Sequence, residues 1–327
     1  MSDWLQGGLQ ADLRAPAVLV TVARVEGSVP REPGARMLVD AQGFGGTIGG
    51  GHLEHRALEM ARAMLTTGGA AHIERFPLGP KLGQCCGGIA WLVFEMADPD
   101  QLAMLHERRN QDTWRTVCVG WGGPPPTRSA SPSAADAPPF DRSLGTHVLE
   151  HDGRLWLIDA VLAPRAHLML FGAGHVGAAI VRALADLPCR VTWIDERDDL
   201  FPPDVPPNVT VEVTDTSEAL VENAAPGTTF LVMTHSHALD LALSHAILSR
   251  PGTPDWFGLI GSDTKRRQFE HRLRERGIAD DRLNDMVCPI GLPGIEGKAP
   301  AVIAASVAAQ LLGVWEAASR PPEDSTE

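Results

Sequence analysis

A glycine-rich turn between an apolar segment and a helical one restricts the fold of this chain more than any other feature. Residues 171–177 read FGAGHVG, with Gly172, Gly174 and Gly177 at the three positions of the pattern GxGxxG. In a βαβ unit these glycines allow a tight turn, close approach of a phosphate and close helix packing. The helix that starts at His175 offers free N–H groups to an anion. Asp195 lies 23 residues after Gly172, where a carboxylate can bind a ribose diol, which favours NAD over NADP.

Strands and helices alternate around this turn. The expected strands are 167–171, 190–194, 209–213, 230–233 and 256–260, and the expected helices are 175–187, 239–248, 263–276 and 299–315. This order predicts a Rossmann-like, doubly wound parallel-sheet domain over 165–316, with helices on both faces. Such a domain can keep its glycines while holding another ligand or none, so the turn leaves NAD(P) open as a ligand.

The first part of the chain has a different pattern and predicts an α+β domain over 1–121. The expected strands are 17–25, 36–39, 45–48, 72–76 and 89–94, with helices over 52–65 and 99–110. Residues 122–139 are rich in Pro, Ser and Ala and predict a loop or disordered insertion. A connecting hairpin with an Asp-Gly turn is expected over 140–164, and an acidic tail over 317–327.

The charge and the cysteines narrow the class of protein. The net charge of −13 disfavours binding to nucleic acid or to an anionic membrane surface. We expect no membrane-spanning run of about 20 apolar residues, and no secretory signal at the N-terminus. Five cysteines, an odd number, favour a reduced cytoplasmic protein over one with a disulfide framework.

Two polar segments follow expected strands of the C-terminal domain. Residues 234–240 read THSHALD, and His235, His237 and Asp240 could together hold a divalent metal. We favour the alternatives, in which this segment binds a substrate or caps the next helix, because it supplies only three ligands. At Gly261-Ser262, Ser262 or Asp263 can cap a helix and Lys265 can bind an anion, whereas Arg266 and Arg267 suit a solvated helix face.

Three glycine-marked segments carry the chemistry of the N-terminal domain. Residues 27–36 form a stiff loop that contains Arg31, and Gly49-Gly50-Gly51 enters a helix. A triple-glycine run costs backbone entropy, which indicates close approach to a ligand or to another strand. Gln84-Cys85-Cys86 lies between glycines. These thiols could ligate a metal or a sulfur-rich cofactor, carry a persulfide, react with an oxidant, or simply occupy a turn.

Taken together, the motifs resemble the xanthine dehydrogenase accessory family, XdhC, whose N-terminal part is shared with the CoxI proteins. The resemblance rests on GSVPREPGARMLV (27–39), GGTIGGGHLEHRAL (45–58), LGQCCGG (82–88), LFGAGHVG (170–177), MTHSHALD (233–240), FGLIGSDTKRRQF (257–269) and CPIGLPGIEGKAPAVIAASVAAQLL (288–312). It implies an N-terminal XdhC/CoxI-type α+β domain followed by the Rossmann-like domain. The chain departs from the pattern at Phe257, where Tyr is expected, and in the insertion at 122–139.

The resemblance implies a cytoplasmic, homodimeric chaperone without turnover of its own. Such proteins bind the molybdenum cofactor (molybdopterin), protect it, support its sulfuration by a cysteine desulfurase and insert it into apo xanthine dehydrogenase. The remaining alternatives are an NAD-dependent oxidoreductase and an accessory factor for a different molybdenum hydroxylase. Cys85 and Cys86 could reach the metal through the cofactor. The residues expected to bind cofactor are Arg31, Gly49, Gly50, Gly51, Gln84, Cys85, Cys86, Gly172, Gly174, His175, Gly177, Asp195, His235, His237, Lys265 and Lys298.

Overall fold

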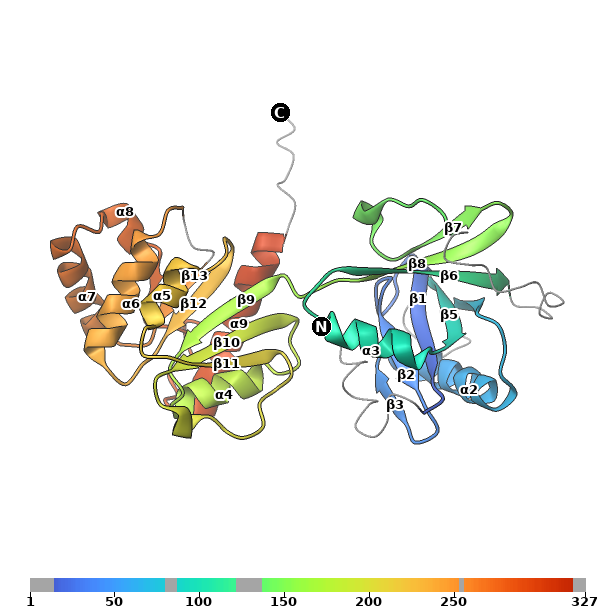
Figure 1. The fold of residues 1–327 in the computed structure, drawn as a ribbon, viewed down its shortest axis with the longest axis horizontal. Coiled ribbons are helices and arrows are strands. Elements are labelled where there is room, and N and C mark those ends of the chain that lie inside the picture. Colours follow the sequence, from blue (N-terminus) through green and yellow to red (C-terminus); the bar gives the residue numbers. More distant parts are fainter. Residues whose placement is uncertain (1–14, 80–86, 122–136, 253–255, 320–327) are drawn as a thin grey trace, which may run out of the picture. The chain divides into compact units, whose positions relative to one another are not determined.

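The computed structural model describes residues 15–79, 87–121, 137–252 and 256–319, which form two compact units (Figure 1). The first unit spans Met1–Ala163 and the second Pro164–Glu327. The hairpin expected to connect them forms an edge of the first unit, because its second strand pairs with the strand over 113–121.

The first unit is built on an eight-stranded, mostly antiparallel sheet of order β3-β2-β1-β5-β4-β6-β8-β7. Its strands are β1 (Val18–Glu26), β2 (Arg36–Val39), β3 (Phe44–Gly46), β4 (His72–Pro77), β5 (Ile89–Met96), β6 (Thr113–Trp121), β7 (His147–His151) and β8 (Arg154–Val161). The pair β4–β6 is parallel. The alternating apolar residues of β1 explain its central place, since Val18, Val20 and Val22 face one helix and Leu19 faces the other side.

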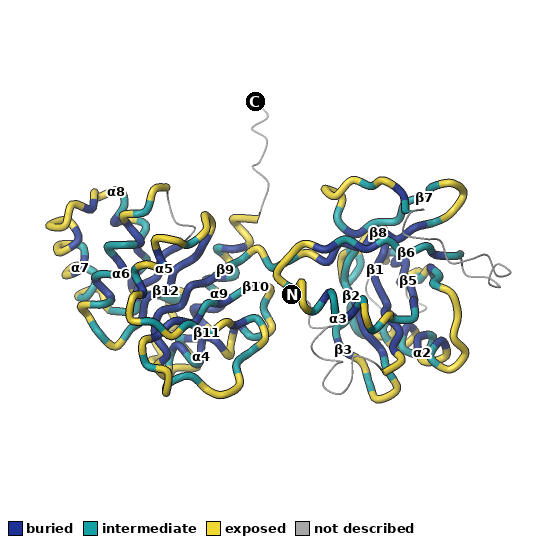
Figure 2. Tube along the Cα trace, viewed as in Figure 1, coloured by how far each residue is buried: buried dark blue, intermediate teal, exposed yellow. Residues whose placement is uncertain are grey.

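Two helices cover this sheet. Helix α2 (Gly51–Thr67) buries Leu53, Ala57 and Ala61 against one face, and α3 (Pro99–Glu107) buries Leu102 and Leu105 against the other. Asp98 caps α3, and a short 3-10 helix, η3 (Arg142–Leu144), precedes β7. The dark blue core in Figure 2 runs along the central strands of this sheet.

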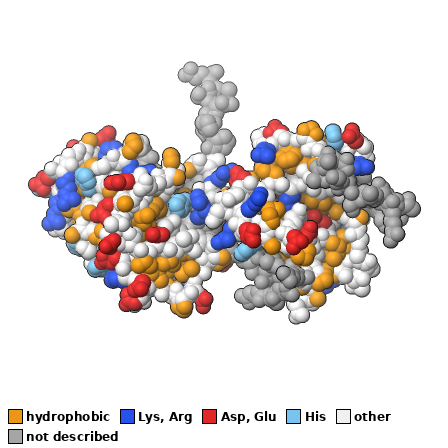
Figure 3. Space-filling model, viewed as in Figure 1, with side chains coloured by type: hydrophobic (Ala, Val, Ile, Leu, Met, Phe, Trp, Pro, Cys, Tyr) orange, Lys and Arg blue, Asp and Glu red, His pale blue; other side chains and the backbone are white. Residues whose placement is uncertain are grey.

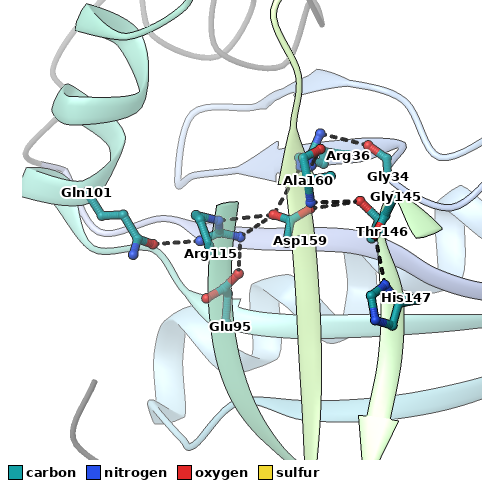
Figure 4. A network of polar contacts seen from close by, with 10 residues as sticks. All are labelled: Gly34, Arg36, Glu95, Gln101, Arg115, Gly145, Thr146, His147, Asp159 and Ala160. Carbon is teal, nitrogen blue, oxygen red and sulfur yellow. Dashed lines mark hydrogen bonds and ion pairs between the residues drawn. The ribbon is translucent and has the colours of Figure 1, made fainter. Parts of the chain in front are cut away.

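A buried ion network joins four strands of the first unit (Figure 4). Asp159 of β8 accepts hydrogen bonds from Arg36 of β2 and from Arg115 of β6, and Arg115 also pairs with Glu95 of β5 at 2.8 Å. Burial alone would raise the pKa of Asp159, but the two guanidinium groups outweigh it and lower this pKa from 3.8 to about 2. Arg36 ends the 27–36 segment that the sequence predicted to be a loop, but in the structure it is the first residue of β2 and its role is structural.

The second unit has a six-stranded parallel sheet of order β11-β10-β9-β12-β13-β14. Its strands are β9 (Ala166–Phe171), β10 (Cys189–Asp195), β11 (Val209–Val213), β12 (Thr228–Val232), β13 (Trp256–Leu259) and β14 (Met286–Val287). Numbered from β9, the order is 3-2-1-4-5-6, which is the Rossmann order. The predicted fold class is therefore confirmed for both units.

Helices lie on both faces of the parallel sheet. Helices α4 (His175–Ala183) and α9 (Pro300–Ser319) pack on one face, and α6 (His237–Ser249) and α7 (Asp263–Glu275) contribute to the core on the other. The motifs did not predict α5 (Ser217–Glu222), η4 (Asp198–Leu200), α8 (Asp280–Leu283) or β14, which are short elements. Very short elements carry too few residues for a periodic signal.

Helix α9 contradicts one expectation. By length and composition it could span a membrane, with a mean hydropathy of 1.6 over its most apolar window. Its apolar character has another reason in this unit, because Ala304, Val307 and Leu311 are buried in the core beside α4. The helix also runs to Ser319, into the segment expected to be tail. Most of the expected Pro/Ser/Ala loop lies outside the described residues.

Candidate functional site

A pocket lies at the carboxyl edge of the parallel sheet in the second unit. Its lining includes Phe171 at the end of β9 and Gly172 after it, Asp195 at the end of β10, and Thr234 and His235 after β12. The loop after β9 leads to α4 on one face of the sheet, and the loop after β12 leads to α6 on the other face. The two loops therefore diverge and leave a space between them. Open α/β sheets bind ligands at this point.

Two of the three fingerprint glycines are required by packing within the protein. A Cβ on Gly172 would lie 2.4 Å from the backbone oxygen of Met233, and one on Gly177 would lie 2.1 Å from that of Gly172. Gly174 differs, because it has an ordinary φ of −71° and a Cβ there would meet no atom of the described residues within 4 Å. Gly174 precedes α4, whose N-terminus has no side-chain cap. A small residue at 174 leaves room above these N–H groups.

Asp195 is buried at the end of β10 and is held by two partners. Its Oδ2 accepts a 2.7 Å hydrogen bond from the Ala173 N–H, and the Arg197 side chain donates to both carboxylate oxygens at 2.9 Å. Burial would raise the pKa of Asp195, but the hydrogen bonds from Arg197 and Ala173 lower it. The carboxylate is therefore ionised at neutral pH and already neutralised by Arg197.

The polar segment after β12 divides its side chains among separate partners. Ser236 caps α6 by accepting from the Leu239 N–H, which is the capping alternative considered from the sequence. His235 lies 3.5 Å from Glu196, and His237 packs edge-on against Phe269. Within the described residues no cluster of three metal-ligating side chains occurs.

Asp240 of the same segment is fully buried and organises the loop that lines the pocket. Its Oδ1 accepts from the Thr234 hydroxyl at 2.7 Å and its Oδ2 from Lys265 Nζ at 2.6 Å. Lys265 also donates to the backbone oxygen of Ile260 at 2.8 Å. The Lys265 ammonium, which the sequence predicted to bind an anion, is thus paired with the buried carboxylate of Asp240.

The other two basic residues of the run on α7, Arg266 and Arg267, differ in their exposure. Figure 3 shows Lys and Arg side chains gathered over α7 in the second unit. Arg267 is exposed, as expected for a solvated face, whereas Arg266 is half-buried and pairs with Glu270 at 2.8 Å. Ser262 caps the helix, which confirms one of the two predicted caps.

In the first unit, the glycine-marked loops meet one another. A Cβ on Gly49, which has a φ of +124°, would lie 2.4 Å from Pro30, so the triple-glycine run packs against the 27–36 loop. On the other side, Gly88 donates a 3.0 Å hydrogen bond to the Ser28 backbone oxygen, and its Cβ would lie 2.4 Å from that atom. The close approach expected of the glycine run is thus made at Gly49 to a loop of the chain, where the sequence suggested a ligand or another strand, and a ligand at this run stays a prediction.

Glu54 closes the turn into α2. Its carboxylate accepts from the Thr47 hydroxyl at 2.5 Å and from the Gly50 N–H at 3.2 Å. Glu54 is absent from the residues predicted to form a site, although an acidic residue in the first turn is a signal for the start of a helix. Arg31 is exposed beside Gly49, and its guanidinium has no ion-pair partner among the described residues.

The thiols fall into two groups. Gln84, Cys85 and Cys86 lie outside the described residues, so the loop between Gly79 and Gly87 contributes only its two ends. Among the described cysteines, burial raises the pKa of the Cys189 and Cys288 thiols to about 11, which makes them unreactive.

Lys298, which the sequence also placed among the cofactor-binding residues, is exposed in the segment before α9.

Two family comparisons match the two units. Residues 11–77 match the XdhC and CoxI family, and residues 168–311 match the XdhC Rossmann domain. The matched ranges contain the 27–36 loop, the triple-glycine run, the glycine fingerprint and Lys265.

Two individual proteins are also similar to this chain. The chain is 32% identical over 168 residues to the uncharacterized protein YqeB of Escherichia coli K12; the match covers 50% of this chain and only 30% of YqeB. A solved structure described as a xanthine dehydrogenase from Bacillus halodurans has a TM-score of 0.68 at 21% identity and covers 98% of both chains. At that identity the likeness shows the fold.

Proposed function

The chain belongs to the XdhC and CoxI family, and from this membership we propose that it is a cytoplasmic accessory protein that binds the molybdenum cofactor as cargo and inserts it into apo xanthine dehydrogenase. Family membership supports the coarser role, an accessory factor in xanthine dehydrogenase maturation. Binding, sulfuration of the cofactor by a cysteine desulfurase, and a homodimeric state are the finer parts of the proposal.

The observation that carries the proposal is the meeting of three loops in the first unit. The 27–36 loop touches the triple-glycine run through Pro30 and Gly49, and touches the end of the cysteine loop through Ser28 and Gly88. Arg31 and the N-terminus of α2 lie at this junction. The cargo is an anionic pterin with a phosphate, and an exposed guanidinium such as that of Arg31 is a donor suited to an anion.

The cysteine loop supplies the chemistry that a sulfur-containing metal cargo needs. Thiolates are soft ligands that suit molybdenum and its dithiolene sulfurs, and a thiol can also carry a persulfide sulfur. We assign Cys85 and Cys86 to retention of the cargo or to its sulfuration. The described ends of their loop join the 27–36 loop through Gly88.

Two other functions compete with this proposal. An NAD-dependent oxidoreductase would use the pocket of the second unit, but would leave the conjunction of the three loops without a purpose. An accessory factor for a different molybdenum hydroxylase would use the same loops and differ only in its client. We favour a protein that delivers cargo without turnover.

The test is co-expression of apo xanthine dehydrogenase with and without this protein, followed by measurement of molybdenum per enzyme and of activity. We expect both to rise with the accessory protein. Pterin bound to the purified accessory protein is quantified after oxidation to its fluorescent form. A second molybdenum hydroxylase in the same assay identifies the client.

A matched pair of variants connects this assay to the site. Arg31→Ala removes the exposed guanidinium at the loop junction, and Arg62→Ala removes an exposed one further along α2. Only Arg31→Ala is expected to lower bound pterin, by at least about fivefold for one charged hydrogen bond. Equal pterin in both variants, or full loading of the enzyme without this protein, contradicts the proposal.

A further inference from the structure

The pocket of the second unit has the composition of a nucleoside site. Its inner surface is apolar, with Phe171 and Ile194 at the strand ends and Leu239 on α6. Its polar lining consists of Asp195, Glu196, Ser217, Thr234 and His235. An apolar slot with a few polar groups at fixed positions is the usual composition of a small-molecule pocket, and a planar base with a ribose beside it matches both parts.

Gly174 supplies an independent observation, because no contact among the described residues requires a glycine there. Gly172 and Gly177 are needed for internal packing, but in the part of the chain that the structure describes a Cβ on Gly174 meets nothing within 4 Å, and its φ is one that any residue adopts. The absence of a side chain matters only if something outside the chain approaches the backbone. A diphosphate next to the uncapped N-terminus of α4 is such a group.

Asp195, however, has no acceptor position left for a ribose. Its Oδ1 accepts from the Arg197 backbone N–H at 3.1 Å and from Arg197 Nε at 2.9 Å, and its Oδ2 accepts from Ala173 and from Arg197 Nη2. A carboxylate has about four lone-pair positions. The Arg197 side chain takes two of them, and it is 35% exposed while that of Asp195 is 3% exposed. It is therefore the partner that can move away.

We propose that this pocket binds a nucleotide through an unmodified ribose diol, and that Arg197 is a specificity-determining residue that occupies the diol's position on Asp195 in the free protein. The diol displaces the guanidinium fork with its two hydroxyls. A ribose 2′-phosphate is rejected, because Asp195, Glu196, Asp198 and Asp199 outnumber the one cation Arg197 at this turn. This proposal goes beyond cofactor delivery and does not depend on it.

The experiment is a fluorescence titration of the full-length protein, without molybdenum cofactor, with NADH and separately with NADPH. We expect NADH to bind at least about tenfold more tightly. Calorimetric titration with ADP, 2′-deoxy-ADP and CDP tests the diol and identifies the base. Loss of the 2′-hydroxyl is expected to weaken binding about tenfold, because a charged hydrogen bond to Asp195 is lost.

The decisive variant is Arg197→Ala. Since it removes the competitor of the diol, NADH should bind about two- to fivefold more tightly, which is the range for a partly exposed ion pair. Arg267→Ala, an exposed arginine on α7, is the matched control and should change nothing. The wild-type ligand series keeps the test valid if the variant is unstable. Four outcomes would overturn the proposal. Two concern the wild-type protein: tighter binding of NADPH than of NADH, and equal binding of ADP and 2′-deoxy-ADP. The others are weaker or unchanged NADH binding in a stable Arg197→Ala variant, and no binding of any probe at millimolar concentration.

Discussion

Lys265 donates a 2.6 Å hydrogen bond from its Nζ to Oδ2 of Asp240, 25 residues earlier in the chain. The pair joins the start of α7 to the first turn of α6, and the other oxygen of Asp240 holds Thr234 in the loop after β12. Thr234 in turn lines the pocket. The two polar segments that the sequence presents separately are therefore one structural unit, and the lysine acts on the pocket through Asp240 and Thr234.

Lys265→Ala should destabilise the second unit strongly. It leaves the carboxylate of Asp240, whose side chain is 1% exposed, without its cation, and breaking a buried pair costs roughly 3–5 kcal/mol. Urea unfolding monitored by circular dichroism measures the loss, with the solvent-exposed Arg267→Ala as control. If the free energy of unfolding falls by less than about 1 kcal/mol, the pair contributes no more than a surface ion pair does.

The ion network of the first unit predicts loss of stability in acid. The pKa of Asp159 is lowered from 3.8 to about 2, so its contribution is complete above about pH 4 and disappears as the pH falls towards 2. A shift of this size corresponds to about 2 kcal/mol. Calorimetry between pH 6 and 2.5 should show one unfolding transition whose midpoint temperature falls as the pH is lowered.

Asp159→Asn identifies that transition. The variant lacks the carboxylate that Arg36 and Arg115 share, so the same transition should already be lowered at pH 6 and should depend less on pH below 4. If the variant and the parent protein lose stability in parallel between pH 4 and 2.5, another group causes the acid sensitivity.

The fingerprint glycines should separate into one that the fold needs and one that a ligand needs. Gly172→Ala forces a Cβ to within 2.4 Å of the Met233 oxygen at a φ of +123° and should cost about 1–3 kcal/mol. Gly174→Asp should retain stability, since Asp is a favourable N-cap, but should abolish NADH binding by repelling the phosphates. Thermal unfolding and NADH titration, both on each variant, distinguish the two. Unchanged NADH affinity in Gly174→Asp would remove the α4 N-terminus from the site.

The paired thiols should matter for cargo and not for the fold. In Cys85→Ala/Cys86→Ala, bound pterin should fall while far-UV circular dichroism stays unchanged, because the change removes two soft donors. Cys118→Ala, at a half-buried free cysteine on β6, is the control. Pterin occupancy equal to that of the parent protein would exclude the thiols as ligands.

Much of the fold could be predicted because its signals are local. The β-branched run of β1, the helical spacing of Leu53, Ala57 and Ala61, and the alternation from β9 onward are each readable within a few residues. The glycine fingerprint likewise marks the α4 turn by its spacing alone. By contrast, the role of Arg36 was not readable, because its partner Asp159 lies 123 residues away.

The amino-acid order alone determined the two domain types, the glycine turn and the family resemblance, since each depends on neighbouring residues or on fixed spacings. Only the tertiary structure decided which partner each polar group takes. Lys265, expected to bind an anion, is paired with Asp240, and Asp195, expected to be open to a ribose, is covered by Arg197. The physical reason is that a buried charge must be neutralised, and the nearest counter-charge is set by how strands and helices pack.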